Sequence, residues 1–295
     1  MDSCTVCNNT GWVIKALDGI ETAVRCPECE PRIRAGKRLG ASGIPPRYSD
    51  RGFNSYMAGD PSQLRALEKA MRFVEDFPKV ERGLLFVGPC GVGKTHLSVA
   101  ILKALIKEKG LRARFVDEAE LMRRLQFSYG PDSTDTEREV LTPLMEVDLL
   151  VWDDLGTGRP TDWVRDTIRM VINYRYTYQK HTIMTTNWLL RDSKLGPLGT
   201  NKAAAGQSLE ERLGIRLFSR VMEMCEVVEL SGPDFRRDIH KAGMDFRGRR
   251  QSKRKSAIQA QLFRCVSCDS KEIQVQDQSE PKRAGKKDFV EVFCL

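Results

Sequence analysis

Residues 88–95 read GPCGVGKT and match the phosphate-loop pattern G-x-x-x-x-G-K-[ST] at every fixed position. The run GLLFV at residues 83–87 is typical of a buried strand, and residues 96–105 carry apolar side chains at helical spacing. A glycine loop between a strand and a helix lets backbone N–H groups surround phosphate oxygens at the helix N-terminus. The stretch therefore predicts a site for a nucleoside triphosphate with Mg²⁺.

Two side chains of this loop have expected roles of their own. Lys94 is expected to reach the β- and γ-phosphates, and Thr95 is expected to bind Mg²⁺ through its hydroxyl. We expect the nucleotide to contact the whole loop and the residue after it, namely Gly88, Pro89, Cys90, Gly91, Val92, Gly93, Lys94, Thr95 and His96. The Cys90 thiol stands at a variable position of the pattern and is given no role.

A second apolar run, VDLLVWDD at residues 147–154, ends in two carboxylates. Asp153 is expected to hold Mg²⁺, directly or through water, and Asp154 to polarise the attacking water as general base. Many ATPases carry Glu at the second position, and Asp is one methylene shorter. A third expected strand, HTIMTTN at residues 181–187, ends at Asn187, which is expected to orient the water and sense the γ-phosphate.

The alternation of these strands with amphipathic segments predicts an α/β fold. The expected core has three layers, α/β/α, with a parallel sheet between helices. Ligands of such sheets collect at the carboxyl ends of the strands, where all three motifs end.

Composition suggests a soluble, cytoplasmic protein. The chain has 295 residues, of which 41% are hydrophobic, and no apolar run approaches membrane-spanning length, so no membrane partner is expected. The N-terminus has neither the basic start nor the apolar core of a secretion signal. We expect four segments: a cysteine module at 1–38, a linker and helix at 39–80, the nucleotide-binding core at 81–240 and a basic, partly disordered extension at 241–295.

The N-terminal cysteines form two C-x₂-C pairs, eighteen residues apart, at Cys4, Cys7, Cys26 and Cys29. Two such knuckles around a small hairpin, with strands at 11–14 and 22–25, predict a closed structural Zn²⁺ site. Metal would then supply much of the folding free energy of this short segment. Near the other end, Cys265, Cys268 and Cys294 lack an obvious fourth ligand, so whether they bind metal is left open. Cys225 precedes an apolar run and is expected in the core.

The net charge of +8 is concentrated at residues 236–255, where nine basic residues stand against two acidic ones. Such a stretch favours a polyanionic partner, most simply nucleic acid, and the alternative is a solvated, flexible tail. Upstream, Arg212, Arg216 and Arg220 recur every four residues and would share one face of a helix. Phosphoryl transfer often uses an arginine from a neighbouring subunit, although an arginine stripe can also be a solvated face.

Taken together, these motifs make the segment at about 40–240 resemble AAA+ ATPases, in particular the DnaC/DnaI-type helicase loaders and the related IstB transposition ATPases. The resemblance rests on GIPPRY with Phe53 and Tyr56, GPCGVGKTHL, DLLVWDDLG, TIMTTN and ERLGIRLFSRV followed by GPDFR. It implies an ATP-driven homo-oligomer that places a replicative DNA helicase on single-stranded DNA.

The resemblance also implies roles by position. Lys94 and Thr95 match Walker A, and Asp153 and Asp154 match Walker B. Asn187 is similar to sensor 1 and Arg236 to sensor 2. Arg220 resembles an arginine finger acting in trans, with Arg216 the next candidate.

Loaders of the DnaI kind place a zinc-bearing module before the ATPase, where it docks on the helicase, and the N-terminal cysteines match that layout. Family members contact single-stranded DNA in the ring pore, for which residues 122–129 offer Arg123, Arg124 and Phe127; alternatively, this is an amphipathic helix with Phe127 in the core. Three functions remain open: a helicase loader, a transposition helper ATPase, and a nucleotide-dependent DNA-binding adaptor with little hydrolysis.

Overall fold

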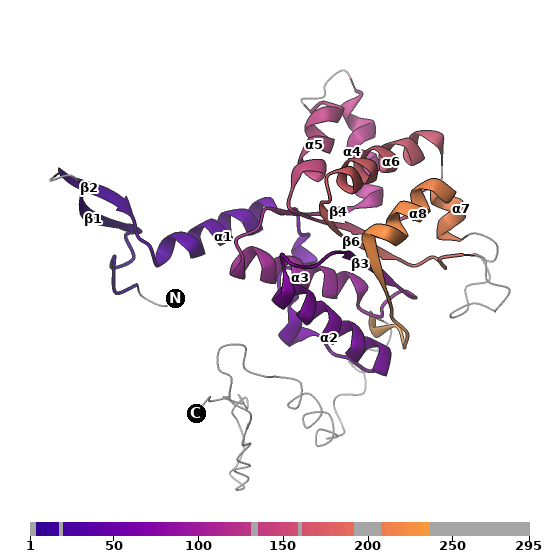
Figure 1. Ribbon diagram of the computed structural model, residues 1–295, viewed down its shortest axis with the longest axis horizontal. Coiled ribbons are helices and arrows are strands. Elements are labelled where there is room, and N and C mark those ends of the chain that lie inside the picture. The colour runs from indigo at the N-terminus through magenta and orange to yellow at the C-terminus, as the bar shows by residue number, and fades with distance from the viewer. Residues whose placement is uncertain (1–3, 18–19, 131–134, 159–160, 192–207, 237–295) are drawn as a thin grey trace, which may run out of the picture. The chain divides into compact units, whose positions relative to one another are not determined.

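Five parallel strands form the sheet at the centre of the nucleotide-binding core (Figure 1). The structure is a computed structural model that describes residues 4–17, 20–130, 135–158, 161–191 and 208–236. In sheet order the strands are β4 (Ala113–Asp117), β5 (Leu149–Asp153), β6 (His181–Thr186), β3 (Gly83–Val87) and β7 (Cys225–Glu229). The predicted α/β fold with a parallel sheet is confirmed.

Alternate side chains of each strand enter two separate hydrophobic cores, because successive strand residues point to opposite faces. Leu84 and Phe86 pack against the helices of one face, and Leu85 and Val87 against those of the other. The first face is covered by α2 (Pro61–Asp76) and α3 (Lys94–Glu108). The second is covered by α4 (Glu118–Ser128), α5 (Glu137–Glu146), α6 (Asp162–Thr177), α7 (Leu209–Leu213) and α8 (Ile215–Met224) (Figure 1). The core is thus the three-layer sandwich that the sequence predicts.

The start of α3 differs from the starts of its neighbours. Asp117 caps α4 by accepting from the Glu120 N–H, and Thr161 caps α6 by accepting from the Val164 N–H. Helix α3 instead follows Gly93, whose φ is +98° and which provides no side-chain cap. The first N–H groups of α3 therefore have no capping side chain and are available to a phosphate.

Arg175 of α6 is fully buried and ties three elements together. Its guanidinium donates to one hydroxyl and four carbonyls: Thr182 Oγ1 and the carbonyl oxygens of Leu144, Met145, Val147 and His181. Three of these carbonyls lie at the end of α5, where the last turn of a helix has no intrahelical donors. Arg175 thus fixes the end of α5 to the start of β6.

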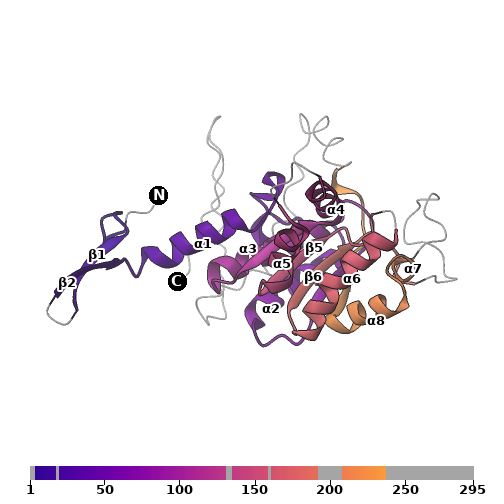
Figure 2. The same cartoon turned by 90° about the horizontal axis from the view of Figure 1, so that it is seen from above.

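The N-terminal segment contains an antiparallel hairpin, β1 (Trp12–Leu17) and β2 (Ile20–Arg25), followed by α1 (Cys29–Ala41) (Figure 2). Ala35 and Leu39 of α1 pack into the core of the α2/α3 face. Two 3-10 turns, η1 (Pro46–Tyr48) and η2 (Phe53–Ser55), precede α2. Among the described residues, none of the helices is both long and apolar enough to cross a membrane.

Candidate active site

The phosphate loop lies between β3 and α3, as predicted, and its glycines allow close packing. A Cβ on Gly93 would lie 2.6 Å from a ring carbon of Tyr56, so a side chain cannot fit there. The Tyr56 hydroxyl donates to the Val92 carbonyl over 3.2 Å, and this hydrogen bond fixes the loop against Tyr56. His96 Nε2 lies 2.8 Å from the Gly52 carbonyl, so its ring is engaged within the chain. The part of His96 left for a nucleotide is its backbone N–H near the helix start.

Lys94 is buried at the floor of the loop with only 5% of its surface exposed. Its Nζ donates to the carbonyls of Gly88 at 2.9 Å and Pro89 at 2.7 Å, and to Asn187 Oδ1 at 2.6 Å. Burial lowers the pKa of Lys94, and the nearby charge of Asp154 opposes that shift. The structure thus brings together Lys94, expected to reach the β- and γ-phosphates, and Asn187, expected to sense the γ-phosphate, although they are 93 positions apart in the sequence.

Thr95 and Asp153 are placed side by side, as a magnesium site requires. Thr95 Oγ1 donates to Asp153 Oδ1 over 2.9 Å, and Thr185 Oγ1 donates to the same oxygen over 2.6 Å. Burial raises the pKa of Asp153 to about 6. A hydroxyl beside a carboxylate is a donor set that suits Mg²⁺, and a bound cation would favour the ionised carboxylate.

Asp154 occupies an unusual backbone conformation, with φ at +57°. Its N–H donates to Thr185 Oγ1 over 2.9 Å, and its Oδ1 accepts from Asn187 Nδ2 over 3.2 Å. Burial raises the pKa of Asp154. Non-glycine residues rarely adopt positive φ, and such strain is often found at functional sites, where surrounding contacts maintain it.

A third carboxylate, Asp117 at the end of β4, was missed by the sequence analysis. Carboxylate oxygens of Asp117, Asp153 and Asp154 lie within 4.8 Å of one another. Strand β4 is short, and one of its five residues is Arg114, which weakens its apolar signal. The available clue is the pair Asp117 and Glu120, since an acidic N-cap followed three residues later by Glu marks a helix start.

The segment after β7 lies directly against the phosphate loop. The Phe235 N–H donates to the Gly91 carbonyl over 3.2 Å, and the Arg236 N–H donates to Asp234 Oδ1 over 3.0 Å. Burial has the largest effect on the pKa values of Lys94 and Asp154, and the positive charge of Arg236 acts to lower both. Arg236 therefore lies beside the nucleotide site, where its predicted role is that of sensor 2.

The expectation that three arginines share one helix is wrong. Gly214, with φ at +80°, separates α7 from α8, so Arg212 belongs to a different helix from Arg216 and Arg220. Arg216 is exposed, whereas Arg220 is half-buried and contacts Asn173 and the Tyr176 ring of its own chain. The trans role of Arg220, with Arg216 as the next candidate, stays a prediction.

The four N-terminal cysteines converge at one point. Their sulfur atoms all lie within 4.8 Å of one another, with 3.8 Å between Cys4 and Cys26 and 3.4 Å between Cys7 and Cys29. A tetrahedral zinc with four thiolates would space its sulfurs about 3.8 Å apart. The Gly11 N–H donates to Cys7 Sγ, as expected of a thiolate ligand supported by its surroundings. The residues present therefore fit a structural zinc.

Helix α4 places the predicted DNA-contacting residues outside the core. Phe127 is 77% exposed, so the alternative that buried it in the core is wrong, although the segment is helical as that alternative held. Arg123 is also exposed, and Arg124 pairs with Asp135 at 2.6 Å. Of the predicted polyanion contact at 236–255, all but Arg236 lies outside the described residues, as do Cys265, Cys268 and Cys294. Cys225 lies in the core, where burial raises its pKa to about 12.

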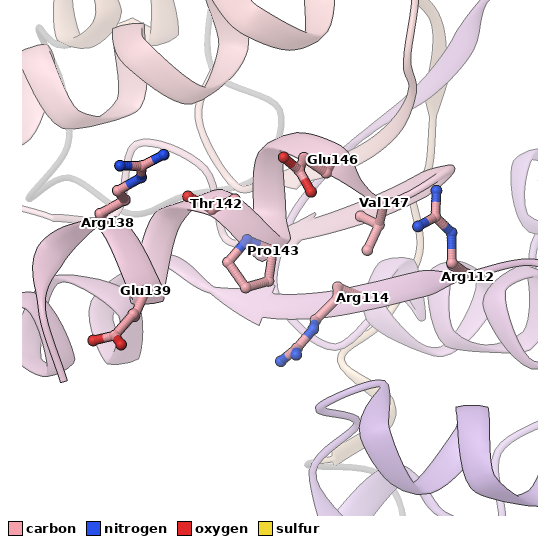
Figure 3. A pocket seen from close by; sticks show the side chains of 8 residues that line it. All are labelled: Arg112, Arg114, Arg138, Glu139, Thr142, Pro143, Glu146 and Val147. Atoms are coloured by element: carbon pink, nitrogen blue, oxygen red, sulfur yellow. The ribbon is translucent and has the colours of Figure 1, made fainter. Parts of the chain in front are cut away.

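An open cleft of about 510 Å³ lies away from this site, between the start of β4 and the end of α5. It is lined by Arg112, Arg114 and Arg138, but their charged ends point in different directions (Figure 3). Arg112 also pairs with Asp148 at 3.2 Å. The cleft therefore does not gather its arginines around a single anion.

Similarity to known proteins agrees with this geometry. The sequence profile of the family described as "IstB-like ATP binding protein" matches residues 46–242. The replicative helicase loader DnaC of Escherichia coli (strain K12) is 29% identical over 181 residues, which cover 60% of this chain and 73% of that protein. The replicative helicase loader DnaC of Buchnera aphidicola subsp. Schizaphis graminum (strain Sg) is 31% identical over 173 residues, covering 58% of this chain and 70% of that protein.

Solved structures give the same result. The crystal structure of the DnaC helicase loader superposes with a TM-score of 0.53 at 37% identity, covering 63% of this chain and all of that one. The structure of DnaI superposes with a TM-score of 0.51 over 65% of this chain and 94% of that one, and at 24% identity it supports the fold alone. The matched profile spans more than half of the sequence, and its range includes the phosphate loop, Asp153 and Asp154. The chain therefore belongs to the IstB-like ATP-binding proteins and is an ATP-hydrolysing AAA+ enzyme of the DnaC/IstB kind.

Proposed function

We propose that the protein is a helicase loader, which binds ATP with Mg²⁺, assembles into an oligomer and places a replicative DNA helicase on single-stranded DNA. The main support is an ATPase site with Walker A, Walker B and sensor residues in contact, in a core that is 37% identical to the DnaC helicase loader. An ATPase of this kind acts as a switch, because nucleotide binding and hydrolysis favour different assemblies.

The site residues suggest how hydrolysis proceeds. Mg²⁺, when bound, offsets phosphate charge and stabilises the leaving group. Thr95 and Asp153 would hold it, and Lys94 would turn its ammonium group toward the β- and γ-phosphates. Asp154 would accept a proton from the attacking water, which Asn187 would orient. Burial suits Asp154 to this role, because a raised pKa makes a carboxylate a stronger base.

The partner can be tested by affinity capture from the native host with the full chain. Since assembly is proposed to depend on ATP, a Lys94→Ala variant is the matched control. Recovery of a hexameric helicase that the control fails to retain supports the loader proposal. If no helicase is recovered under conditions in which the protein binds ATP, the proposal fails.

A transposition helper is the second candidate, because the family profile that matches this chain is named for IstB. In the same capture experiment, recovery of a transposase instead of a helicase would favour it. Stable ATP binding with turnover no faster than that of Lys94→Ala would favour the third reading, a nucleotide-dependent DNA-binding adaptor.

For DNA, we propose contact through the exposed face of α4 together with the basic extension. Arg123 and Phe127 lie four residues apart and are both exposed, so a phosphate contact and a base-stacking contact share one face. Arg123→Ala and Phe127→Ala should each weaken single-stranded DNA binding, whereas Arg169→Ala, on the exposed side of α6, should not.

The contribution of the extension can be separated by truncation after Lys241, which keeps Arg236. This variant should retain nucleotide affinity and show a shallower dependence of log affinity on log salt, because fewer phosphate contacts are made. An unchanged slope would assign DNA binding to α4 alone.

We further propose that Cys4, Cys7, Cys26 and Cys29 bind one structural Zn²⁺ and that this module docks on the helicase. The sulfur spacing supports the first part. A closed site of four thiolates has no open position for chemistry, so its role would be to stabilise a docking surface.

A further inference from the structure

We propose that Glu118 and Arg212 are positioning residues of the ATPase site. Between them they hold residues 155–158, the loop that directly follows Asp153 and Asp154. This inference concerns the hydrolysis step and does not depend on which macromolecule the ATPase serves.

Glu118, the first residue of α4, has a fully buried carboxylate that faces this loop. Its Oε2 accepts from the Gly156 N–H at 2.7 Å and from the Trp152 indole N–H at 3.3 Å, and its Oε1 accepts from the Gly158 N–H at 2.9 Å. Burial raises the pKa of Glu118, and these three donors oppose the shift. A buried carboxylate with donors on both oxygens fixes the backbone that supplies them.

Arg212, from α7, holds the same two residues through their carbonyls. Its Nη1 donates to the Gly156 carbonyl at 2.8 Å and to the Gly158 carbonyl at 3.0 Å. Its guanidinium carbon lies 3.5 Å from the centre of the Trp188 ring. Arg212 therefore contacts two segments of the site: the loop after Asp154, the proposed base, and Trp188, which directly follows Asn187, the proposed sensor.

The loop is therefore bound on both sides, with its N–H groups held by an anion and its C=O groups held by a cation. Burial lowers the pKa of Arg212, and the charge of Glu118 opposes that shift, as expected for two opposite charges acting across one short loop. The Asp154 carbonyl accepts from the Thr157 N–H at 3.1 Å, so Asp154 and the loop form one turn. Asp154 keeps its positive φ only while neighbouring contacts maintain it, and the loop provides such contacts.

The contacts of Arg212 also join the loop at 155–158 to α7 and, through it, to α8, which carries the candidate trans arginines. Helix α7 ends one residue before Gly214, and α8 begins one residue after it with Arg216 in its first turn. Arg165 Nε donates to the Arg212 carbonyl at 3.1 Å, which fixes the end of α7 to α6. A shift of α7 and α8 would therefore reach Asp154 through Arg212.

The test uses the full chain and two mild substitutions, Glu118→Gln and Arg212→Lys, alone and combined. Gln keeps the shape of Glu but presents an NH₂ group to one of the loop donors. Lys keeps the charge of Arg but lacks the planar group that stacks on Trp188 and reaches two carbonyls. Glu120→Gln on α4 and Arg169→Lys on α6 are matched exposed controls. For each variant, kcat and KM for ATP, the Kd of a non-hydrolysable ATP analogue and the melting temperature are measured.

We expect each single variant to lower kcat by roughly tenfold to a hundredfold, because small displacements of a catalytic group cost rate steeply. The Kd of the analogue should change by less than about threefold, since the contacts that carry this proposal join both residues to the loop at 155–158 and not to the phosphate loop. The combined variant should lose less than the product of the single losses, because either change alone already frees the loop. The controls should keep the parental kcat.

Two results would overturn the proposal. One is a parental kcat in both single variants at temperatures where they are folded. The other is a loss of kcat that is matched by loss of analogue binding, which would indicate a general structural defect. If Arg212→Lys does not fold, Trp188→Leu, which removes the stacking surface, replaces it, and the same drop in kcat at unchanged Kd is expected.

Discussion

Asn187 is the residue that connects the two charged halves of the site. Its Oδ1 accepts from Lys94 and its Nδ2 donates to Asp154, so one amide satisfies a cation and an anion at once. An amide can do this because it carries an acceptor and a donor on one rigid plane. A carboxylate at this position would repel Asp154, which explains why an Asn suits the tip of β6.

A substitution of Asp154 by Asn tests the proposed base. Binding of ATP should persist, while kcat should fall by roughly a hundredfold to ten-thousandfold, because an amide cannot accept the proton of the attacking water. Turnover is measured beside nucleotide affinity, with Asp162→Asn, an exposed carboxylate on α6, as the control. Lys94→Ala, in contrast, should lose ATP binding itself. Parental turnover of the Asp154→Asn protein would refute the assignment.

Among the elements, α7 and α8 show how a periodic pattern can mislead. Arginines at every fourth position predict one helical face. Gly214, however, adopts a positive φ and ends α7 before α8 begins, so the arginines lie on two helices. Arginines of one sequence pattern therefore have different surroundings. Arg212 contacts the loop at 155–158, whereas Arg216 is exposed to solvent.

The trans role is tested by mixing inactive variants. Arg220→Ala protein combined with Lys94→Ala protein should regain activity, since one supplies an intact pocket and the other an intact arginine. The same mixture is made with Arg216→Ala, the next candidate. If co-assembled mixtures never exceed the summed activities of their components, neither arginine acts across a subunit boundary.

Helix α6 allows a matched comparison of a buried and an exposed arginine. Arg175→Met should destabilise the fold by about 3–5 kcal/mol, because it leaves buried carbonyls at the end of α5 without donors. Arg169→Met, on the exposed side of the same helix, should change stability by less than about 1 kcal/mol. Denaturant unfolding of both variants measures the difference, and equal effects would contradict the role given to Arg175.

For the molecule as a whole, the sequence predicts those elements whose function requires fixed residue types or whose burial requires a regular apolar pattern. The phosphate loop, β3 and β5 could be predicted because glycines, Lys-Thr and continuous apolar runs allow few alternatives. Strand β4 was not predictable in the same way, since it is short and interrupted by Arg114. Asp117 is its last residue and Glu118 follows it, so the carboxylate that holds residues 155–158 was missed as well. Tertiary contacts such as Glu118 with Gly156 leave no local pattern in sequence.

Loss of zinc should impair the helicase binding of the N-terminal module and leave the ATP affinity of the ATPase core unchanged. Cys26→Ser should lose its zinc and its helicase binding, while ATP affinity stays at the parental value, because among the described residues the cysteines cluster with one another and with Val13 and Ile33. Val6→Ser, an exposed change between two of the ligands, is the control. Elemental analysis gives the metal content, and a freshly purified, reduced protein without zinc would rule out the site.

The uncapped start of α3 has a consequence for protein engineering. Replacing the residue before a helix with Ser, Asp or Asn is a standard way to raise thermal stability, typically by about 1 kcal/mol. At Gly93 the same replacement would meet the Tyr56 ring and direct a side-chain oxygen at N–H groups that the nucleotide needs. Any search for more robust variants of this ATPase should therefore exclude this position, because stability and activity impose opposite requirements on one glycine.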